Sequence, residues 1–177
     1  MLRQHGRMLI RRECSADVDA IRTVTTRAFD GMPYSNGSEP RLVDALRADR
    51  GWIPALSLVA EVDGAVVGHV VCTRATVAGQ PSLGLGPLSV DPAWQRRGVG
   101  SALVHAVLGG ADALGEPVVV LLGNPAYYHR FGFKLASEYG IEPPVPQWVP
   151  HFQARTLSTY RADLRGPFEY AAPFQDA

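Results

Sequence analysis

The residues best suited to chemistry are two arginines and two glycines in the segment Gln95–Ser101, which reads QRRGVGS. Glycines at the start of a helix let a ligand approach the backbone closely. The free N–H groups of a first helical turn, with the positive end of the helix dipole, form an anion site. The arginines add charge-assisted donors that suit phosphate. The segment therefore predicts phosphate binding, although an ordinary helix start with solvated arginines would look the same.

This segment differs from the two best-known nucleotide-binding loops. No Gly-Lys-Ser/Thr follows it, so it is not a Walker loop, and it lacks the six-residue glycine spacing of a dinucleotide fold.

A strand with a phase change is expected before the loop. Leu83 and Leu85 place apolar side chains at odd positions, whereas Leu88 and Val90 place them at even positions. Side chains alternate between faces with a period of two, so an inserted residue is needed to keep all four on one face. Gly86-Pro87 lies at the change, and proline lacks the N–H for one ladder bond. We expect a β-bulge there.

A helix and a buried strand are expected after the loop. Apolar residues recur at helical spacing over residues 99–114, as in Val99, Leu103 and Val107. Residues 118–122 are all Val or Leu, which is typical of a strand covered on both faces. Strand, helix and strand over residues 83–122 form a βαβ unit with two parallel strands and a right-handed crossover.

The remaining elements alternate along the chain. Ser15 could cap a helix over residues 16–29, and Ser38 could cap a second helix. Asp63-Gly64 favours a tight hairpin, whose second strand would place Val67 and His69 on one face. Further strands are expected at residues 8–12, 56–62, 65–77, 133–136, 154–160 and 168–171, with a short Tyr-rich helix at 125–130.

Composition limits the class of protein. The chain has 177 residues with 46% hydrophobic content, which suits one domain with a sizeable core. Seventeen basic and 17 acidic residues give zero net charge, which argues against a general nucleic-acid binder. No apolar run is long enough for a membrane helix. Two cysteines make neither a disulfide framework nor a zinc site. We expect a cytoplasmic domain at 8–177 after a dispensable leader at 1–7.

Two segments together resemble a known family. Residues 88–92 followed by 95–101 are similar to the acetyl-CoA pyrophosphate motif, Q/R-x-x-G-x-G/A, of the GCN5-related N-acetyltransferases (GNAT). Residues 124–133, NPAYYHRFGF, resemble the second signature of the family, an Asn and then Tyr-x-x-x-Gly-Phe. The resemblance covers about residues 8–140, and the Pro-rich tail is similar, more loosely, to a bacterial subgroup of this family.

The resemblance implies an α/β fold, in which a mixed central sheet has parallel strands splayed around the βαβ unit and helices flank it. It implies acetyl-CoA as co-substrate and no metal. The backbone of the bulged strand would meet pantetheine, the glycine loop would hold the pyrophosphate, and the second signature would lie near the thiol. The implied cofactor-binding residues are Leu88, Ser89, Val90, Gln95, Arg96, Arg97, Gly98, Val99, Gly100, Ser101, Asn124 and Tyr128.

The implied activity is transfer of an acetyl group to a primary amine of a small molecule or peptide, by direct attack on the thioester. Tyr128 matches the family position for the general acid, although it could instead be a packing tyrosine. Several relatives carry a carboxylate on the bulged strand, but residues 83–90 contain none. Glu61 and His69 are therefore the candidate bases, directly or through water, and Glu39 could line the acceptor mouth.

Two other functions stay open. The missing strand carboxylate is compatible with a non-catalytic acyl-CoA-binding sensor or structural module. An unrelated α/β nucleotide binder would share the loop but not the second signature. The loop 30–38 is expected to border the acceptor, whose identity the sequence does not indicate. A C-terminal strand with an open edge could pair two copies into a homodimer.

Overall fold

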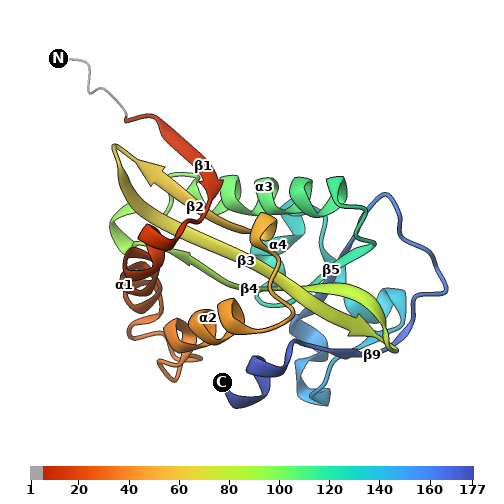
Figure 1. The fold of residues 1–177 in the computed structure, drawn as a ribbon. Coiled ribbons are helices and arrows are strands. Elements are labelled where there is room, and N and C mark those ends of the chain that lie inside the picture. Colours follow the sequence, from red (N-terminus) through yellow and green to blue (C-terminus); the bar gives the residue numbers. More distant parts are fainter. Residues whose placement is uncertain (1–5) are drawn as a thin grey trace.

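The computed structural model describes residues 6–177 and contains a mixed, open sheet with helices on both faces (Figure 1). Residues 1–5 of the expected leader lie outside the described part. The strands are β1 (Met8–Arg12), β2 (Ser57–Val62), β3 (Ala65–Val77), β4 (Gln80–Val90), β5 (Val118–Leu122), β6 (Lys134–Leu135), β7 (Ile141–Glu142), β8 (Phe152–Thr156) and β9 (Gly166–Glu169). The α-helices are α1 (Val18–Phe29), α2 (Glu39–Ala48), α3 (Val99–Ala113) and α4 (Pro125–Tyr128).

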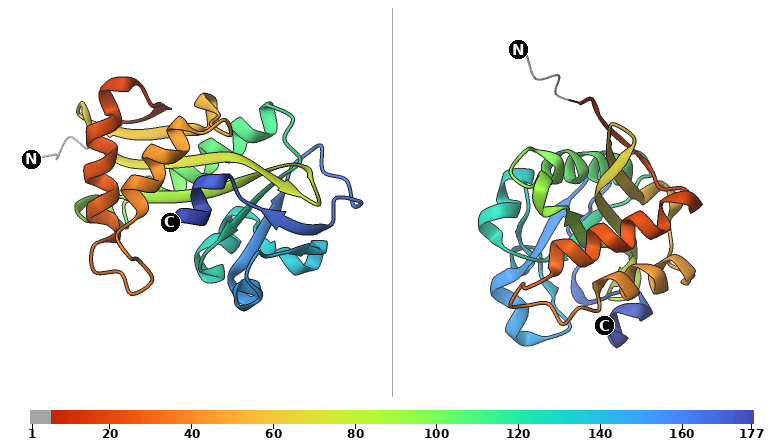
Figure 2. Two further views of the ribbon diagram at one scale, coloured as in Figure 1. Left: turned by 60° about the horizontal axis from the view of Figure 1, so that its bottom comes forward. Right: turned by 90° about the vertical axis from the view of Figure 1, so that its left-hand side faces the viewer.

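The sheet runs in the order β1-β2-β3-β4-β5-β8-β6, and β9 pairs with β3 and β7. Helices α1 and α2 lie together on one face, and α3 covers the other (Figure 2). The largest apolar core lies between α3 and the sheet, where Leu103 and Val107 are fully buried against strand residues such as Val70 and Leu83. The apolar stripe expected for residues 99–114 is confirmed at Val99, Leu103 and Val107, which face the sheet, whereas Leu114 follows the last residue of α3 and is exposed.

The phase change in β4 is a β-bulge, as predicted. Val70 pairs with Leu88 and Cys72 pairs with Leu85, so Gly86 and Pro87 together face one residue of β3. The bulge places Leu83, Leu85, Leu88 and Val90 on the α3 side of the sheet. An inserted residue thus reconciles two opposite sequence phases with one apolar face.

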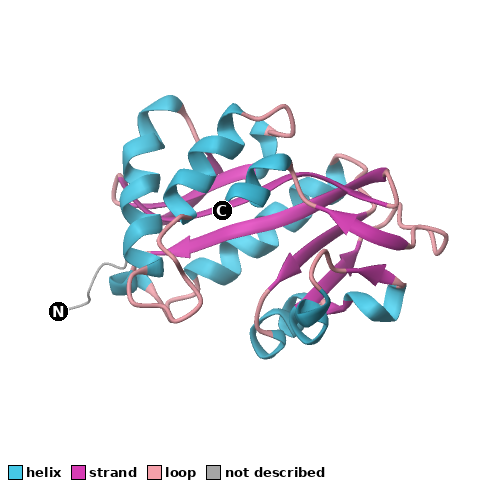
Figure 3. Ribbon diagram, turned by 90° about the horizontal axis from the view of Figure 1, so that it is seen from below, coloured by secondary structure: helices cyan, strands magenta, loops and turns pink. Residues whose placement is uncertain are grey.

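The parallel strands β4 and β5 splay after a short contact. They pair only at Leu83 with Val119 and at Gly84 with Val120. Beyond Gly84, β4 runs through its bulge while β5 follows β8 into the second arm of the sheet. In Figure 3 the two groups of strands diverge like the arms of a V. The opening between the two strands is the region where β4 has no hydrogen-bonded neighbour on its β5 side.

A second bulge, between β2 and β3, changes which side chains of β3 share a face. Ala60 pairs with Gly68 but Glu61 pairs with Val66, so Val67 is the inserted residue. Val67 consequently packs into the core under α3, and Val66 packs on the α1 side. The expectation that Val67 shares a face with His69 is wrong, because sequence alternation alone does not reveal this insertion.

Several expected boundaries also shift. Ser15 does not cap α1: it lies in a 3-10 turn, Ser15–Asp17, where the Asp17 carboxylate accepts a hydrogen bond from the Cys14 backbone N–H at 2.8 Å. Ser38 precedes α2 without a side-chain cap. The strands expected at 133–136, 154–160 and 168–171 are β6, β8 and β9, shorter or displaced toward the N-terminus. Short elements depend on pairing partners that local sequence does not specify.

A buried polar cluster ties the first three strands to α2. The Glu13 carboxylate accepts a hydrogen bond from Ser57 Oγ at 2.5 Å and pairs with Arg47 Nε at 2.6 Å. His69 Nε2 lies 2.8 Å from Ser57 Oγ and 3.3 Å from Glu13 Oε2. Burial alone would raise the pKa of Glu13, but hydrogen bonds from His69, Arg47 and Ser57 lower it to about 2.

The cluster predicts loss of stability in acid. A carboxyl pKa lowered from 4.5 to about 2 stabilises the folded state by about 3 kcal/mol above pH 4.5, and this contribution disappears as pH falls toward 2. We expect Glu13→Gln to be less stable than the wild type at pH 7, with the difference closing as the pH falls. Urea unfolding of both proteins between pH 7 and pH 2 measures it. A difference that stays constant with pH would contradict this assignment.

Candidate functional site

The backbone of β4 beyond its bulge faces the opening. The Asp91 N–H donates to the Val67 carbonyl of β3, so by alternation the N–H groups of Leu88 and Val90 point to the other side. No β5 residue pairs with this part of β4. The Val90 carbonyl instead accepts a hydrogen bond from Gln95 Nε2 at 3.2 Å. Leu88 and Val90 thus offer backbone groups to an extended ligand that enters the V.

Ser89 lies differently from its neighbours. It pairs with His69 of β3, and by the same alternation its N–H points toward that strand. Its side chain is buried on the α1 side, where the hydroxyl lies 3.3 Å from Thr25 Oγ1. The structure therefore separates Ser89 from the opening, in contrast to the sequence prediction.

The glycine loop forms a concave set of backbone donors. Arg96 and Gly98 have positive φ values of 59° and 82°, separated by Arg97. Such alternation turns successive N–H groups toward one point, the geometry of an anion-binding nest. Helix α3 starts at Val99, and its first internal bond runs from the Ala102 N–H to the Gly98 carbonyl. The N–H groups of residues 99–101 therefore have no helical acceptor and extend the anion site.

Neighbouring side chains hold this loop in place. Asp91 Oδ1 accepts a hydrogen bond from the Ala93 N–H at 2.9 Å, and Asp91 Oδ2 pairs with Arg27 of α1 at 2.7 Å. The Arg97 guanidinium lies 5.2 Å from the centre of the Trp94 ring. Trp94 packs against the main core and so anchors the loop.

Tyr127 reaches the first turn of α3, a role that the sequence did not indicate. A Cβ atom on Gly100 would lie 2.6 Å from its hydroxyl oxygen, so the glycine makes room for the ring. Arg130 covers that ring, with its guanidinium carbon 4.8 Å from the ring centre. The only sequence signal for this contact is the glycine itself, because the two residues meet through the tertiary fold.

Tyr128 lies at the end of β5, on the opposite side of the V from the bulge. Asn124 caps α4, because its Oδ1 accepts a hydrogen bond from the Ala126 N–H at 3.0 Å. The Tyr128 ring covers Gly123, where a Cβ atom would lie 2.5 Å from the ring. Burial raises the pKa of Tyr128, and the nearby hydroxyls of Tyr127 and Tyr34 raise it further. The phenol is therefore protonated at neutral pH and can donate a hydrogen bond.

The narrow end of the opening is closed from the α1–α2 side by Tyr170. A Cβ atom on Gly84 would lie 2.8 Å from its ring, at the last pair between β4 and β5. Burial raises the pKa of the Tyr170 hydroxyl. Tyr170 belongs to the C-terminal segment, and no motif in the sequence singled it out.

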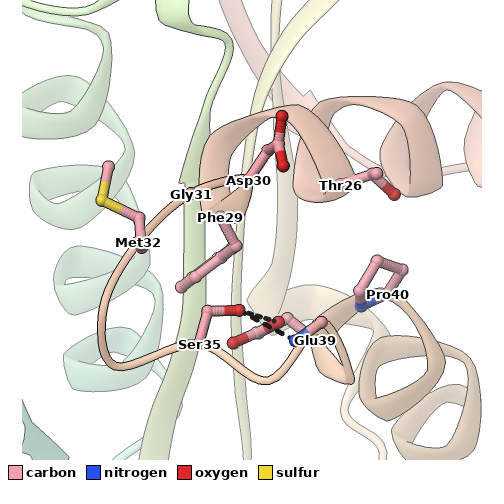
Figure 4. A pocket seen from close by; sticks show the side chains of 9 residues that line it. Thr26, Phe29, Asp30, Gly31, Met32, Ser35, Glu39 and Pro40 are labelled. Carbon is pink, nitrogen blue, oxygen red and sulfur yellow. Dashed lines mark hydrogen bonds between the residues drawn. The ribbon is translucent and has the colours of Figure 1, made fainter.

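A cavity of about 340 Å³ lies between the end of α1 and the start of α2 (Figure 4). Its wall includes residues of the loop expected to border the acceptor, and Glu39 of α2 also lines it. Tyr34 of this loop packs edge-on against Phe29 at 6.4 Å between ring centres.

The structure does not bring the two candidate bases to the opening. His69 is fully buried, and its Nε2 points to Ser57 and Glu13. Burial lowers the pKa of His69, so the imidazole is neutral in the folded protein. Glu61 pairs with Arg11 of β1 at 2.8 Å. Both side chains are thus held by partners on the β1–β2 side of the sheet.

Among residues 6–177, no group of three or more His, Cys, Asp or Glu side chains has the arrangement needed to hold a metal ion. Within the same range, no helix has the length and apolarity required to cross a membrane.

The chain is similar to known acetyltransferases in sequence. Residues 54–135 match the profile of the acetyltransferase (GNAT) domain. The chain is 38% identical over 166 residues to the uncharacterized N-acetyltransferase YjhQ of Escherichia coli, covering 89% of each protein. It is 35% identical over 154 residues to the uncharacterized N-acetyltransferase YhbS of the same organism, covering 85% of this chain and 88% of YhbS.

Two solved structures are similar over almost the whole chain. A GNAT family acetyltransferase from Brucella melitensis, in complex with acetyl-CoA, has a TM-score of 0.81 and 38% identity and covers 96% of this chain and 99% of its own. YhbS of Escherichia coli, in complex with CoA, has a TM-score of 0.89 and 32% identity and covers 99% of this chain and 96% of its own.

Proposed function

Since the chain belongs to the GNAT acetyltransferase family, we propose that it transfers the acetyl group of acetyl-CoA to a primary amine. The observation that carries this proposal is the position of the open V. The free backbone edge of β4 leads directly into the anion-binding loop before α3. A ligand with an extended arm and a pyrophosphate fits these two features together.

Three parts of acetyl-CoA would each meet a matching group on the chain. The loop from Gln95 to Ser101 would hold the pyrophosphate through backbone N–H groups and the two arginines. Leu88 and Val90 would pair with the amides of pantetheine in the way that a neighbouring strand would. The amide nitrogen of Asn124, whose oxygen is used in capping α4, would meet the thiol end of the arm.

The reaction exchanges one bond to the acetyl carbon for another. The neutral amine attacks the thioester carbonyl, a C–N bond forms, and the carbonyl oxygen becomes an oxyanion. A backbone N–H near the bulge, at Leu88 or Val90, would stabilise this oxyanion. The C–S bond then breaks, the nitrogen loses a proton, and the sulfur gains one. The products are an N-acetyl amide and CoA as its thiol.

Tyr128 is proposed as the general acid for the leaving sulfur. Its raised pKa keeps the phenol protonated, so that it donates a hydrogen bond as negative charge develops on the sulfur. Because the surroundings of Tyr128 are partly desolvated, they disfavour a free CoA thiolate and therefore favour transfer of the phenol proton to the sulfur.

Water is proposed as the first acceptor of the amine proton. His69 is enclosed in the core, and Glu61 is paired with Arg11, so neither side chain reaches the opening. If either residue takes part in the reaction, it would act on the amine proton through water.

A second candidate function is an acyl-CoA-binding sensor without turnover. It is favoured by the distance of both candidate bases from the opening and by the absence of a carboxylate on β4.

A thermal-shift comparison of acetyl-CoA, CoA, ATP and NAD tests the cofactor. A ligand at 100 times its dissociation constant stabilises the folded state by about 2.7 kcal/mol. For a chain of this size the midpoint should rise by about 5–11 °C. We expect this rise with acetyl-CoA and CoA only. No rise with either at millimolar concentration would refute both functions. Release of free CoA thiol with an added amine then separates the enzyme from the sensor.

A further inference from the structure

We propose that Gln153 and Arg155 of β8 are positioning residues, which hold the segment 123–131 at its two ends and thereby fix the direction of the Tyr128 hydroxyl. This inference rests on the proposed function, because it takes Tyr128 as the general acid. Neither side chain of β8 is proposed to touch acetyl-CoA or the amine.

The segment that carries Tyr128 has little regular structure of its own. Helix α4 has four residues and is followed by a 3-10 turn of three residues, His129–Phe131. A helical stretch this short is not stable by itself, because forming the first turn costs more conformational entropy than its few hydrogen bonds offset. The direction of the Tyr128 side chain therefore depends on how the ends of the segment are held.

Gln153 holds the first end. This residue is 1% exposed, and its Nε2 donates hydrogen bonds to the Gly123 carbonyl at 3.0 Å and to the His151 carbonyl at 3.4 Å. The backbone pairing of β5 with β8 ends at Leu122 and Phe152. Gly123 lies just beyond it, and its N–H donates to the His151 carbonyl at 2.9 Å. Both backbone groups of Gly123 are thus held from the β8 side.

The Tyr128 ring lies directly on the backbone that Gln153 holds. A Cβ atom at Gly123 would lie 2.5 Å from that ring. Gln153 pairs with Leu121 in the sheet, and directly paired residues place their side chains on the same face. Leu121 belongs to the apolar core against which Tyr128 packs. Packing in this core does not require an amide, and burying one is unfavourable unless it is hydrogen-bonded.

Arg155 holds the second end. Its Nε donates to the carbonyl of Phe131, the last residue of the 3-10 turn, at 2.9 Å, and Nη1 donates to the Thr156 carbonyl. Gly132 makes room for the guanidinium, because a Cβ atom there would lie 2.7 Å from Arg155 Nε. The ring of Phe131 in turn lies 6.3 Å from the ring of Tyr128, measured between centres. Arg155 therefore fixes a neighbour that packs on the phenol.

One strand consequently controls both ends of the segment. Gln153 and Arg155 are two residues apart on β8, so their side chains lie on the same face of the sheet. A displacement of about 1 Å at a reacting group can lower a rate by about 100-fold. The contribution of the two side chains to turnover should therefore pass through the Tyr128 hydroxyl.

The test is a double-mutant cycle on kcat, measured as thiol release from acetyl-CoA. The acceptor is whichever of n-butylamine, 2-phenylethylamine and lysine the wild type acetylates fastest. Gln153→Met keeps the length of the side chain and removes both donors. We expect it to lower kcat about tenfold and to leave the KM for acetyl-CoA within about twofold. In a Tyr128→Phe background it should change kcat by less than about twofold, since the hydroxyl is absent.

Two further substitutions separate positioning from a general effect on the fold. Arg155 is only half-buried, so Arg155→Met is the second variant should Gln153→Met not fold, and it should behave in the same way. Arg155→Lys keeps a donor and should restore kcat to within about threefold of the wild type. Arg74→Met is the matched control, because it removes an arginine hydrogen bond to Glu116 before the other end of β5. It should leave kcat unchanged in both backgrounds.

Amide hydrogen exchange gives a readout that does not need turnover. In Gln153→Met the amides of residues 124–131 should exchange about tenfold faster than in the wild type, while those of α3 keep their rates. Equal losses of kcat with and without the Tyr128 hydroxyl, an unchanged kcat, or unchanged exchange would each overturn this inference and leave acetyl transfer standing. A wild type that binds CoA but acetylates no amine would refute the proposed enzyme instead, and exchange alone would then decide whether β8 holds the Tyr128 segment.

Discussion

Tyr128→Phe is expected to lower kcat for acetyl transfer by about 100-fold, because the loss of a positioned general acid costs between 10²- and 10⁴-fold. The phenyl ring would still cover Gly123 and meet Phe133, so the packing at the end of β5 would be retained. Only the hydroxyl is lost, and with it the hydrogen bond to the leaving sulfur. CoA affinity should therefore change by no more than about twofold.

Single-turnover kinetics with acetyl-CoA, together with CoA titration, would measure the two quantities separately. Tyr139→Phe is the matched control, since Tyr139 packs against Tyr160 in a different cluster. It should leave kcat and CoA affinity unchanged. A Tyr128→Phe enzyme with wild-type turnover would remove Tyr128 from the role of acid, and a large loss of CoA affinity would make it a binding residue instead.

Gly98→Asp is expected to weaken CoA binding by about 100-fold relative to Gly98→Asn. A Cβ atom at Gly98 meets nothing within 4 Å, and Asp and Asn both tolerate its φ of 82° better than other residues do. The two variants therefore share the backbone cost and differ mainly in charge. A carboxylate at the start of α3 would repel the pyrophosphate that the loop is proposed to hold.

Thermal melts with and without CoA separate affinity from stability. A negative charge at a helix N-terminus is favourable for the free protein. The free Asp variant should therefore melt no lower than the Asn variant, while its CoA-induced rise in midpoint is reduced or lost. Equal rises for both variants would show that the pyrophosphate does not lie at this loop.

The sequence predicted those parts of the site that depend on neighbours along the chain. The anion-binding loop follows from two glycines and two arginines before an amphipathic helix. The bulge in β4 follows from Leu83 and Val90 being out of phase across Gly86-Pro87, and the structure confirms it. These are local properties, because a helix start and a strand phase are set within a few residues.

The sequence alone determined the βαβ unit and the loop before α3, because strand alternation, helical spacing and glycine positions depend on residue order. The two motifs at 88–101 and 124–133 determined the family resemblance. Only the tertiary structure decided that Ser89 faces α1, that His69 is enclosed by Glu13 and Ser57, and that Tyr127 and Tyr170 reach the site. Those outcomes depend on which distant segments pack together. Packing is decided by the fit of the whole core, and no short stretch of sequence contains that information.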